Sequence, residues 1–251
     1  MSTDTVQYLL RLGDNALVLS HRLSEWCGKG PALEEDMALA NTALDLLGQA
    51  RLWLSHAAEC EGAGRDEDAL AYRRDDRQFR NLLLVERPNG TYADTMVRQF
   101  FFDAWHHLLL QKLCRSTDEH IAGIAAKAIK EVEYHLRRSS DLVVRLGDGT
   151  EKSHQLMQAA VDELWTYTGE MFDGDELEVR IAAAGIGVDP SRLRELWLAY
   201  VREVLSEATL KIPSPEAFMQ RGGKQGRHSE ALSYLLGEMQ SLQRAYPDAQ
   251  W

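Results

Sequence analysis

Residues 118–146 read DEHIAGIAAKAIKEVEYHLRRSSDLVVRL, and this stretch decides the fold class. It contains no proline, and its apolar side chains recur at three- and four-residue steps, the spacing of one face of an α-helix. The row consists of Ile121, Ala125, Ala128, Val132, His135, Ser139 and Leu142. The stretch therefore predicts a long amphipathic helix whose apolar face is interrupted by a histidine.

The same spacing predicts two helices near the N-terminus, at about 5–27 and 33–61. The run Gly28-Lys29-Gly30-Pro31 stops the first helix, and such a short connection favours an antiparallel hairpin. In the second helix we expect the core-facing row to be Met37, Ala40, Leu44, Leu47, Arg51, Leu54 and Ala58.

A second hairpin is predicted from a helix at about 92–114 and the helix at 118–146. The charged connection 62–90, with two short helices around Ala69 and Leu83, is long enough to cross over between the hairpins. Two long pairs joined by a crossover are typical of a ferritin-like four-helix bundle. Further helices are expected at about 152–172, 176–184, 189–210 and 229–247, with a loop at 212–227. We therefore expect an all-α chain with a single domain over 1–251, a core bundle at about 5–146 and accessory helices at about 152–246.

The composition indicates which partners to exclude and which cellular compartment to expect. The chain of 251 residues has 39 acidic and 28 basic side chains and a net charge of −11, so its field repels nucleic acid. Its three cysteines form no Cys-x-x-Cys pair, which favours a reducing, cytoplasmic environment. Charged residues interrupt the N-terminal apolar stretch, and no other stretch is apolar enough to cross a membrane. We expect neither nucleic acid nor membrane as a partner.

Ferritin-like bundles can hold two irons through a carboxylate from each of two helices and a Glu-x-x-His pair from each of the other two. Here the residue three before His135 is Val132, and the residue three after Asp45 is Gly48. Neither valine nor glycine has a ligand atom, so both pairs are broken. We predict a degenerate pocket with no bound metal, formed by Asn15, Asp45, Gly48, Asp103, Val132 and His135.

Two interpretations of these polar residues are open. In the favoured one, Asp103, Asp45, His135 and Asn15 satisfy one another in the core, helped by Lys130 or Arg51, because unpaired buried charge is costly. The alternative is a di-iron oxidase that uses a shifted ligand set. That set would be Asp14, Asp45, Asp103, Glu131 and His135.

Three other features have a structural and a functional interpretation. His106 and His107 are adjacent on a helix and point to different faces, so we expect one in the core and one at the surface. The run 222–228, GGKQGRH, could cradle a phosphate, with Lys224 as a contact to CoA, but a structural turn is favoured. Glycines inside helices, such as Gly13, Gly48 and Gly123, indicate close helix approach.

Several separated blocks resemble one family, the structural subunits of the bacterial phenylacetyl-CoA epoxidases. The blocks are Leu10–Asn15, Leu19–Leu23, Glu25–Cys27, Leu44–Arg51, Asn81–Glu86, Ala126–Glu131, Tyr134–Arg137, Gly222–Lys224 and Gln250–Trp251. Together they extend from one terminus to the other.

The resemblance implies a non-catalytic structural subunit that pairs with a homologous catalytic subunit in a multicomponent monooxygenase. The partner is expected to carry the di-iron centre that epoxidises the ring of phenylacetyl-CoA in aerobic phenylacetate degradation. A reductase subunit with flavin and iron–sulfur groups would supply electrons from NADPH. The chain itself is expected to bind no cofactor, to contribute no catalytic residue, and to form a hetero-oligomer, or a homodimer when alone.

Overall fold

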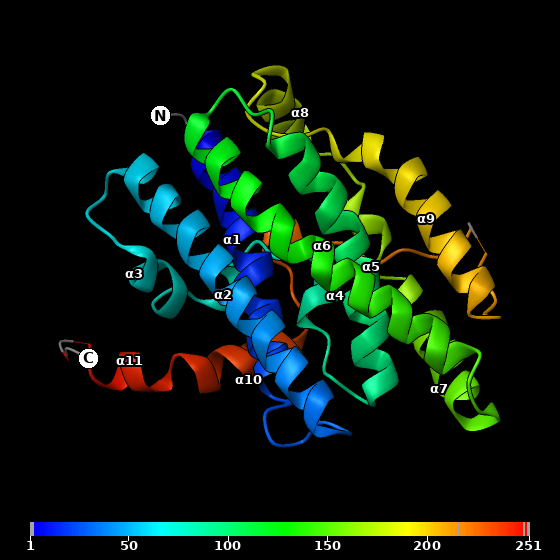
Figure 1. Cartoon of the computed structure of the whole chain (residues 1–251). Coiled ribbons are helices and arrows are strands. Elements are labelled where there is room, and N and C mark those ends of the chain that lie inside the picture. Colours follow the sequence, from blue (N-terminus) through cyan, green and yellow to red (C-terminus); the bar gives the residue numbers. More distant parts are fainter. Residues whose placement is uncertain (1–2, 215, 248, 250–251) are drawn as a thin grey trace. The chain divides into compact units, whose positions relative to one another are not determined.

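The computed structural model describes residues 3–214, 216–247 and 249, and over these residues the chain is all-α, with no strand (Figure 1). This confirms the predicted class. Within the described ranges, none of the helices has the length and apolar character needed to span a bilayer. The terminal Gln250–Trp251, one of the blocks that carry the resemblance, lies outside the described residues.

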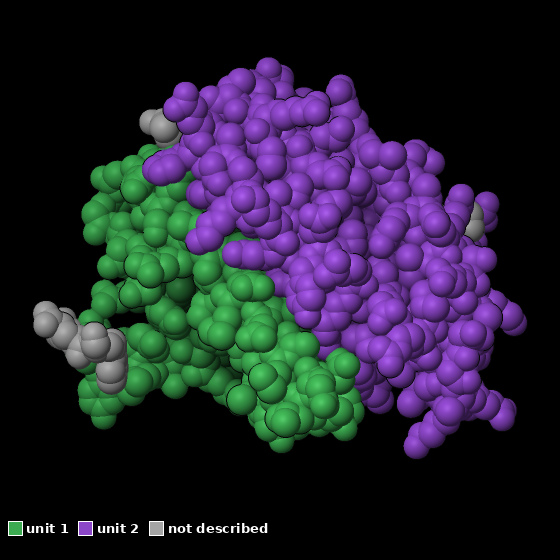
Figure 2. Space-filling view, in the orientation of Figure 1, with its two compact units in different colours: residues 1–88, 222–251 green, residues 89–221 purple. Residues whose placement is uncertain are grey.

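The chain divides into two compact units, shown in green and purple in Figure 2. Unit 1 comprises residues 1–88 and 222–251, and unit 2 comprises residues 89–221. The N-terminal hairpin and the C-terminal segment thus belong to one unit, and the second hairpin with its following helices belongs to the other. The single domain over 1–251 stays a prediction.

Unit 1 is built on the hairpin of α1, Thr3–Ser24, and α2, Leu33–Glu61, which pack along each other. A Cβ added at Gly13 of α1 would lie 2.7 Å from the side chain of Leu54, so a larger residue here would force Leu54 to shift. The expected close contact is thereby confirmed at Gly13. It is wrong at Gly48 and Gly123, where a Cβ would meet nothing within 4 Å.

The core-facing row predicted for α2 is largely wrong. Met37, Leu44 and Leu47 are exposed, and the Arg51 side chain is 75% exposed and bonds Glu67. The row that packs in unit 1 consists of Leu39, Ala43, Leu46, Ala50, Trp53, Leu54, Ala57 and Ala58. α2 carries two apolar rows on different faces, and periodicity alone does not say which row meets α1.

The connection that follows α2 contains the two short helices that the sequence predicts, α3 at Glu67–Tyr72 and α4 at Leu83–Glu86. Asp14 and Asn15 of α1 hold this connection. The Arg74 guanidinium forms a buried ion pair with Asp14, and the Arg80 backbone N–H donates to Asp14 at 2.8 Å. Asn15 Oδ1 accepts from the backbone N–H of Leu82 at 2.8 Å. Two polar groups that looked like site residues are therefore structural ties.

The C-terminal segment of unit 1 forms α10, Glu230–Met239, and α11, Ser241–Ala245. One continuous helix was expected here. The break falls at Gln240, whose side-chain amide donates to the carbonyls of Ala71 and Arg74 at 3.0 Å each. The side chain of Gln240 thus satisfies backbone acceptors of the connection at the point where the helix is interrupted.

Unit 2 is built on α5, Tyr92–Leu113, and α6, Glu119–Gly147. Thr91 and Asp118 cap their N-termini through side-chain oxygens that accept backbone N–H bonds, which fixes where each helix starts. Three further helices pack on this pair or follow it: α7 at Glu151–Trp165, α8 at Glu176–Ala183 and α9 at Arg194–Glu207. α7 ends at Trp165, seven residues before the predicted end at 172. Residues 169–171 form a separate 3-10 turn.

The Asp14–Arg74 pair yields a first prediction. Asp14→Asn would leave the Arg74 guanidinium buried without its counter-charge, and losing one partner of a buried pair costs about 3–5 kcal/mol. We expect that loss in the free energy of unfolding, measured by urea denaturation followed by circular dichroism.

The matched control is Asp141→Asn on α6, whose ion pair with Arg145 is exposed on both sides. Exposed pairs contribute about 0–1 kcal/mol, so this variant should unfold close to the parent. Equal losses in the two variants would contradict the role assigned to Asp14.

Candidate functional site

The buried polar cluster of unit 2 is centred on Asp103 of α5, whose side chain is fully buried. Gln99, one turn earlier on α5, donates to Asp103 Oδ1 at 2.6 Å. Ser139 Oγ of α6 donates to Asp103 Oδ2 at 2.9 Å. Residues four apart share a helix face, which is why Gln99 reaches Asp103 without any distortion. Each carboxyl oxygen thus has one neutral donor.

Burial dominates the electrostatics of this cluster. It raises the pKa of Asp103 to about 6, although the His135 charge and the bonds from Ser139 and Gln99 act in the opposite direction. Burial also lowers the pKa of His106 to about 3, and the neighbouring His135 adds to that shift. His106 is therefore neutral at pH 7, whereas Asp103 gains and loses its proton close to neutral pH.

The donor set in unit 2 does not suit a di-iron centre. Val132, one turn before His135, is completely buried and offers no ligand atom. The cluster thus presents one carboxylate, Asp103, and the imidazoles of His135 and His106. A carboxylate-bridged iron pair needs several anionic donors to offset the metal charge, and one carboxylate does not supply them.

The site residues expected from the N-terminal hairpin lie in unit 1, and each is described there. Asn15 is buried and tied to Leu82, while Asp14 is tied to Arg74. Asp45 is half-buried and Gly48 is exposed. Neither Asp45 nor Gly48 belongs to the row of α2 that is buried in unit 1.

The two cations proposed to help in the core do not do so. Lys130 is exposed on α6, and the Arg51 side chain is 75% exposed on α2. The residue that neutralises a buried carboxylate is Arg74, 60 positions from Asp14 and outside any long helix. Nothing in the local sequence marks Arg74 for that role. Of the histidine pair, His106 is buried and His107 is half-buried, close to the expected division.

Sequence reasoning also missed a second buried pair in unit 1, between Glu86 and His228. His228 Nδ1 lies 2.7 Å from Glu86 Oε2, and the backbone N–H of Ser229 donates to Glu86 Oε1 at 2.7 Å. Burial acts to lower the pKa of His228, but the bond and charge of Glu86 and the bond to the carbonyl of Phe79 outweigh it and raise the pKa. The pair joins residues 142 positions apart, which no local pattern reveals.

The glycine run 222–228 forms a packed turn of unit 1. Gly222 and Gly226 have φ of +136° and +76°, and a Cβ at Gly226 would clash with the carbonyl oxygen of Arg77. Both positions therefore require glycine for structural reasons. Lys224 is 5% exposed within this turn. Its contact with CoA stays a prediction.

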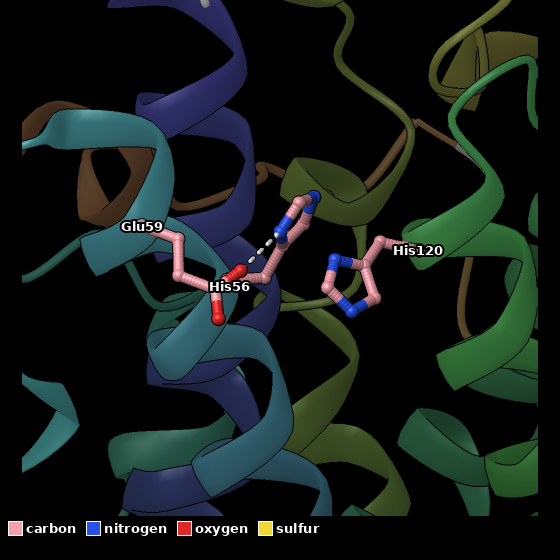
Figure 3. A group of neighbouring side chains, drawn as sticks. All are labelled: His56, Glu59 and His120. Atoms are coloured by element: carbon pink, nitrogen blue, oxygen red, sulfur yellow. Dashed lines mark hydrogen bonds and ion pairs between the residues drawn. The ribbon is translucent and has the colours of Figure 1, made fainter.

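Figure 3 draws a group of side chains that the sequence did not single out. His56 and Glu59, one turn apart on α2, pair at 3.5 Å, and the Cys60 Sγ lies 3.8 Å from His56 Nε2. His120, also drawn there, comes from the first turn of α6 in unit 2. Within unit 1, the buried His56 and the exposed Glu59 form a pair three residues apart on α2.

The whole chain matches one family of known proteins. A model of the phenylacetic acid catabolic protein family matches residues 1–251. The chain belongs to this family. It is 56% identical over 244 residues to the C subunit of the 1,2-phenylacetyl-CoA epoxidase of Escherichia coli K12, covering 97% of this chain and 98% of that protein. The resemblance recognised from the sequence blocks is thereby confirmed.

A second relative is the A subunit of the same Escherichia coli epoxidase. It is 25% identical over 140 residues, which are 56% of this chain and 44% of that protein. The chain is thus similar to the C subunit along nearly its whole length and to the A subunit over part of it.

The raised pKa of Asp103 yields a second prediction. A buried carboxyl with a pKa of about 6, against about 3.9 when unfolded, binds a proton in the folded chain between those values. The contribution of Asp103 to folding stability therefore falls as pH rises from about 4 to above 6, whereas the contribution of His106, whose pKa burial lowers to about 3, rises over much of the same range. A pKa difference of about two corresponds to roughly 3 kcal/mol of stability lost over this range, and Asp103→Asn should abolish that loss.

The measurement is the free energy of unfolding at several pH values between about 4 and 7.5. The matched control is Asp162→Asn, an exposed carboxylate on α7 of the same unit. It should follow the parent's pH dependence. If Asp103→Asn kept the parent's slope, the carboxyl would not be the group that titrates.

Proposed function

We propose that this chain is a metal-free structural subunit of a multicomponent oxygenase that acts on phenylacetyl-CoA. The observation that carries this proposal is the pair of positions Val132 and Gly48, which replace ligand side chains where a ferritin-like di-iron bundle needs them. The 56% identity to the C subunit of an epoxidase supports membership of such a complex. The catalytic work belongs to a homologous partner.

The proposal includes the architecture of the assembly. We infer that the α1–α2 and α5–α6 hairpins form one ferritin-like bundle within a single domain, as the duplicated layout of the sequence indicates. The homologous partner would hold the di-iron centre. A reductase with flavin and iron–sulfur groups would deliver electrons from NADPH, and the complex would work in the cytoplasm.

The competing function is an oxidase that uses Asp14, Asp45, Asp103, Glu131 and His135 as ligands. Two contacts argue against it. Asp14 is already neutralised by Arg74, and a carboxylate in a buried ion pair is not free to offset a metal charge. Asp103 has both oxygens bonded by neutral donors, and burial favours its protonated form. Of the five proposed ligands, this leaves Asp45, Glu131 and His135.

The outward face of α2 supports binding to another protein. Leu33, Met37, Leu44 and Leu47 are 73%, 57%, 65% and 40% exposed, and their spacing places them in one row. Contiguous apolar rows on a helix surface are typical of interaction sites. We propose that this row contacts the homologous catalytic partner, because an obligate partner would bury such a surface permanently.

The iron content of the purified chain tests the proposal. We expect close to no iron in the chain expressed alone in iron-supplemented cells. After co-expression with the catalytic partner, iron should appear in the complex at about two atoms per pair of subunits. The measurement is metal analysis of each preparation.

The control for this measurement is His135→Ala. If the lone chain retained about two irons and lost them in this variant, the chain would hold its own di-iron site and the structural role would be refuted. Unchanged iron content of the complex carrying His135→Ala is the result expected from a metal-free subunit.

A further prediction concerns the α2 row. Leu44→Lys places a charge in the centre of the proposed interface and should weaken binding to the catalytic partner at least about tenfold. Co-purification and titration of the two proteins measure this. The matched control is Tyr234→Lys on α10 of the same unit, where the side chain is 72% exposed outside the row. Equal binding by both variants would place the interface elsewhere.

A further inference from the structure

Unit 2 contains a pocket of about 530 Å³ that the proposed function does not use. It lies where the end of α7, the start of α9 and the loop segments 212–214 and 216–221 meet. The loop is held in place by two bonds to one residue: Thr166 Oγ1 donates to the carbonyl of Phe218 at 2.6 Å, and the N–H of Gln220 donates to the carbonyl of Thr166 at 2.7 Å. All lining residues belong to this unit.

One wall of the pocket is aromatic. The ring centroids of Trp165 and Trp197 are 5.7 Å apart, and those of Phe172 and Trp197 are 5.2 Å apart. Such a surface suits a planar apolar group, because aromatic rings stack or meet edge to face at these separations.

The same wall contains an unsatisfied donor. The indole N–H of Trp197 donates to the carbonyl of Phe101 at 3.0 Å. The indole nitrogen of Trp165, whose side chain is 4% exposed, has no hydrogen-bond acceptor among the described residues. Buried donors are nearly always paired, so this N–H needs an acceptor, either an ordered water or a ligand atom, that the described residues do not supply.

The rim of the pocket is basic. Arg194, Arg202 and Arg221 line it together with one carboxylate, Asp173. Asp173 pairs with Arg221 at 2.6 Å, while Arg194 and Arg202 form no ion pair with any residue that the structure describes. A surplus of two positive charges thus surrounds the pocket of a chain whose net charge is −11. This local reversal of sign favours an anion.

We propose that the pocket binds a small aromatic anion, with its ring against Trp165, Phe172 and Trp197 and its anionic group facing Arg194 and Arg202. The acceptor for the Trp165 N–H would come from the same ligand. Two kinds of molecule share this chemistry, an aromatic carboxylate and a nucleotide with its planar base and phosphate. The inference does not rest on the subunit role proposed above.

The test is isothermal titration calorimetry of the full chain with two anionic probes and their neutral counterparts. The pairs are benzoate with benzamide, and AMP with adenosine. We expect at least one anion to bind about tenfold or more tightly than its neutral counterpart, since bonds to charged groups are the stronger ones. The anion that binds identifies the source. If neither anion binds more tightly than its counterpart, the proposal is overturned.

Variants locate the binding. Arg194→Gln combined with Arg202→Gln should weaken the anion at least about tenfold. The control with the same charge change is Arg180→Gln combined with Arg192→Gln, because both side chains are exposed in this unit and neither lines the pocket. Equal weakening by the two double variants would show a general field effect and overturn the site.

Trp165→Phe keeps an aromatic ring and removes the N–H. We expect affinity to fall about three- to tenfold, the usual effect of one hydrogen bond. Because Trp165 is buried, the smaller ring should also lower the unfolding midpoint, so affinity is measured at a temperature where the variant is fully folded. An unchanged affinity in this variant would remove Trp165 from the proposed contact and contradict the inference as stated.

Discussion

The ion pair between Asp14 and Arg74 is the interaction on which unit 1 depends. Asp14 is fully buried in the middle of α1, where an uncompensated carboxylate would be very costly. Arg74 meets it from the connection after α2, and the backbone N–H of Arg80 adds a further donor. Detaching the connection from the hairpin would therefore leave the buried Asp14 carboxylate without its counter-charge.

The same segment then organises the C-terminus. The carbonyl of Arg74 accepts bonds from the Gln240 amide and the Arg244 guanidinium, and Asp75 pairs with Arg244. The Glu86–His228 pair adds a second buried tie between the connection and the last segment. Residues far apart in sequence are thus joined by charge and hydrogen bonding, while apolar packing holds the helices of the hairpin together. This explains why residues 222–251 belong to unit 1.

The helices of this fold were predictable because periodicity and caps are local. The bounds of α2 were predicted to the residue, and the caps at Thr91 and Asp118 lie one residue before α5 and α6. Which face of α2 is buried was not predictable, since two apolar rows of this helix satisfy the same spacing. Only the packing of α2 against α1 decides between them. Long-range partners were not predictable either. Arg74 and His228 carry no local signature, and their roles arise only when the chain brings them to Asp14 and Glu86.

The buried carboxyls of Asp14 in unit 1 and Asp103 in unit 2 are stabilised in two different ways. A buried carboxylate needs a counter-charge, neutral hydrogen-bond donors or a proton, and in a di-iron bundle the metal ions supply the counter-charge. In unit 1 the charge of Asp14 is offset by a guanidinium. In unit 2 Asp103 is instead held by neutral donors, and burial favours adding a proton. The first solution keeps the charge and fixes a connection, whereas the second raises the pKa of the carboxyl to about 6 and joins α5 to α6 through Ser139. Both solutions use only groups of the chain to satisfy the carboxyls of Asp14 and Asp103.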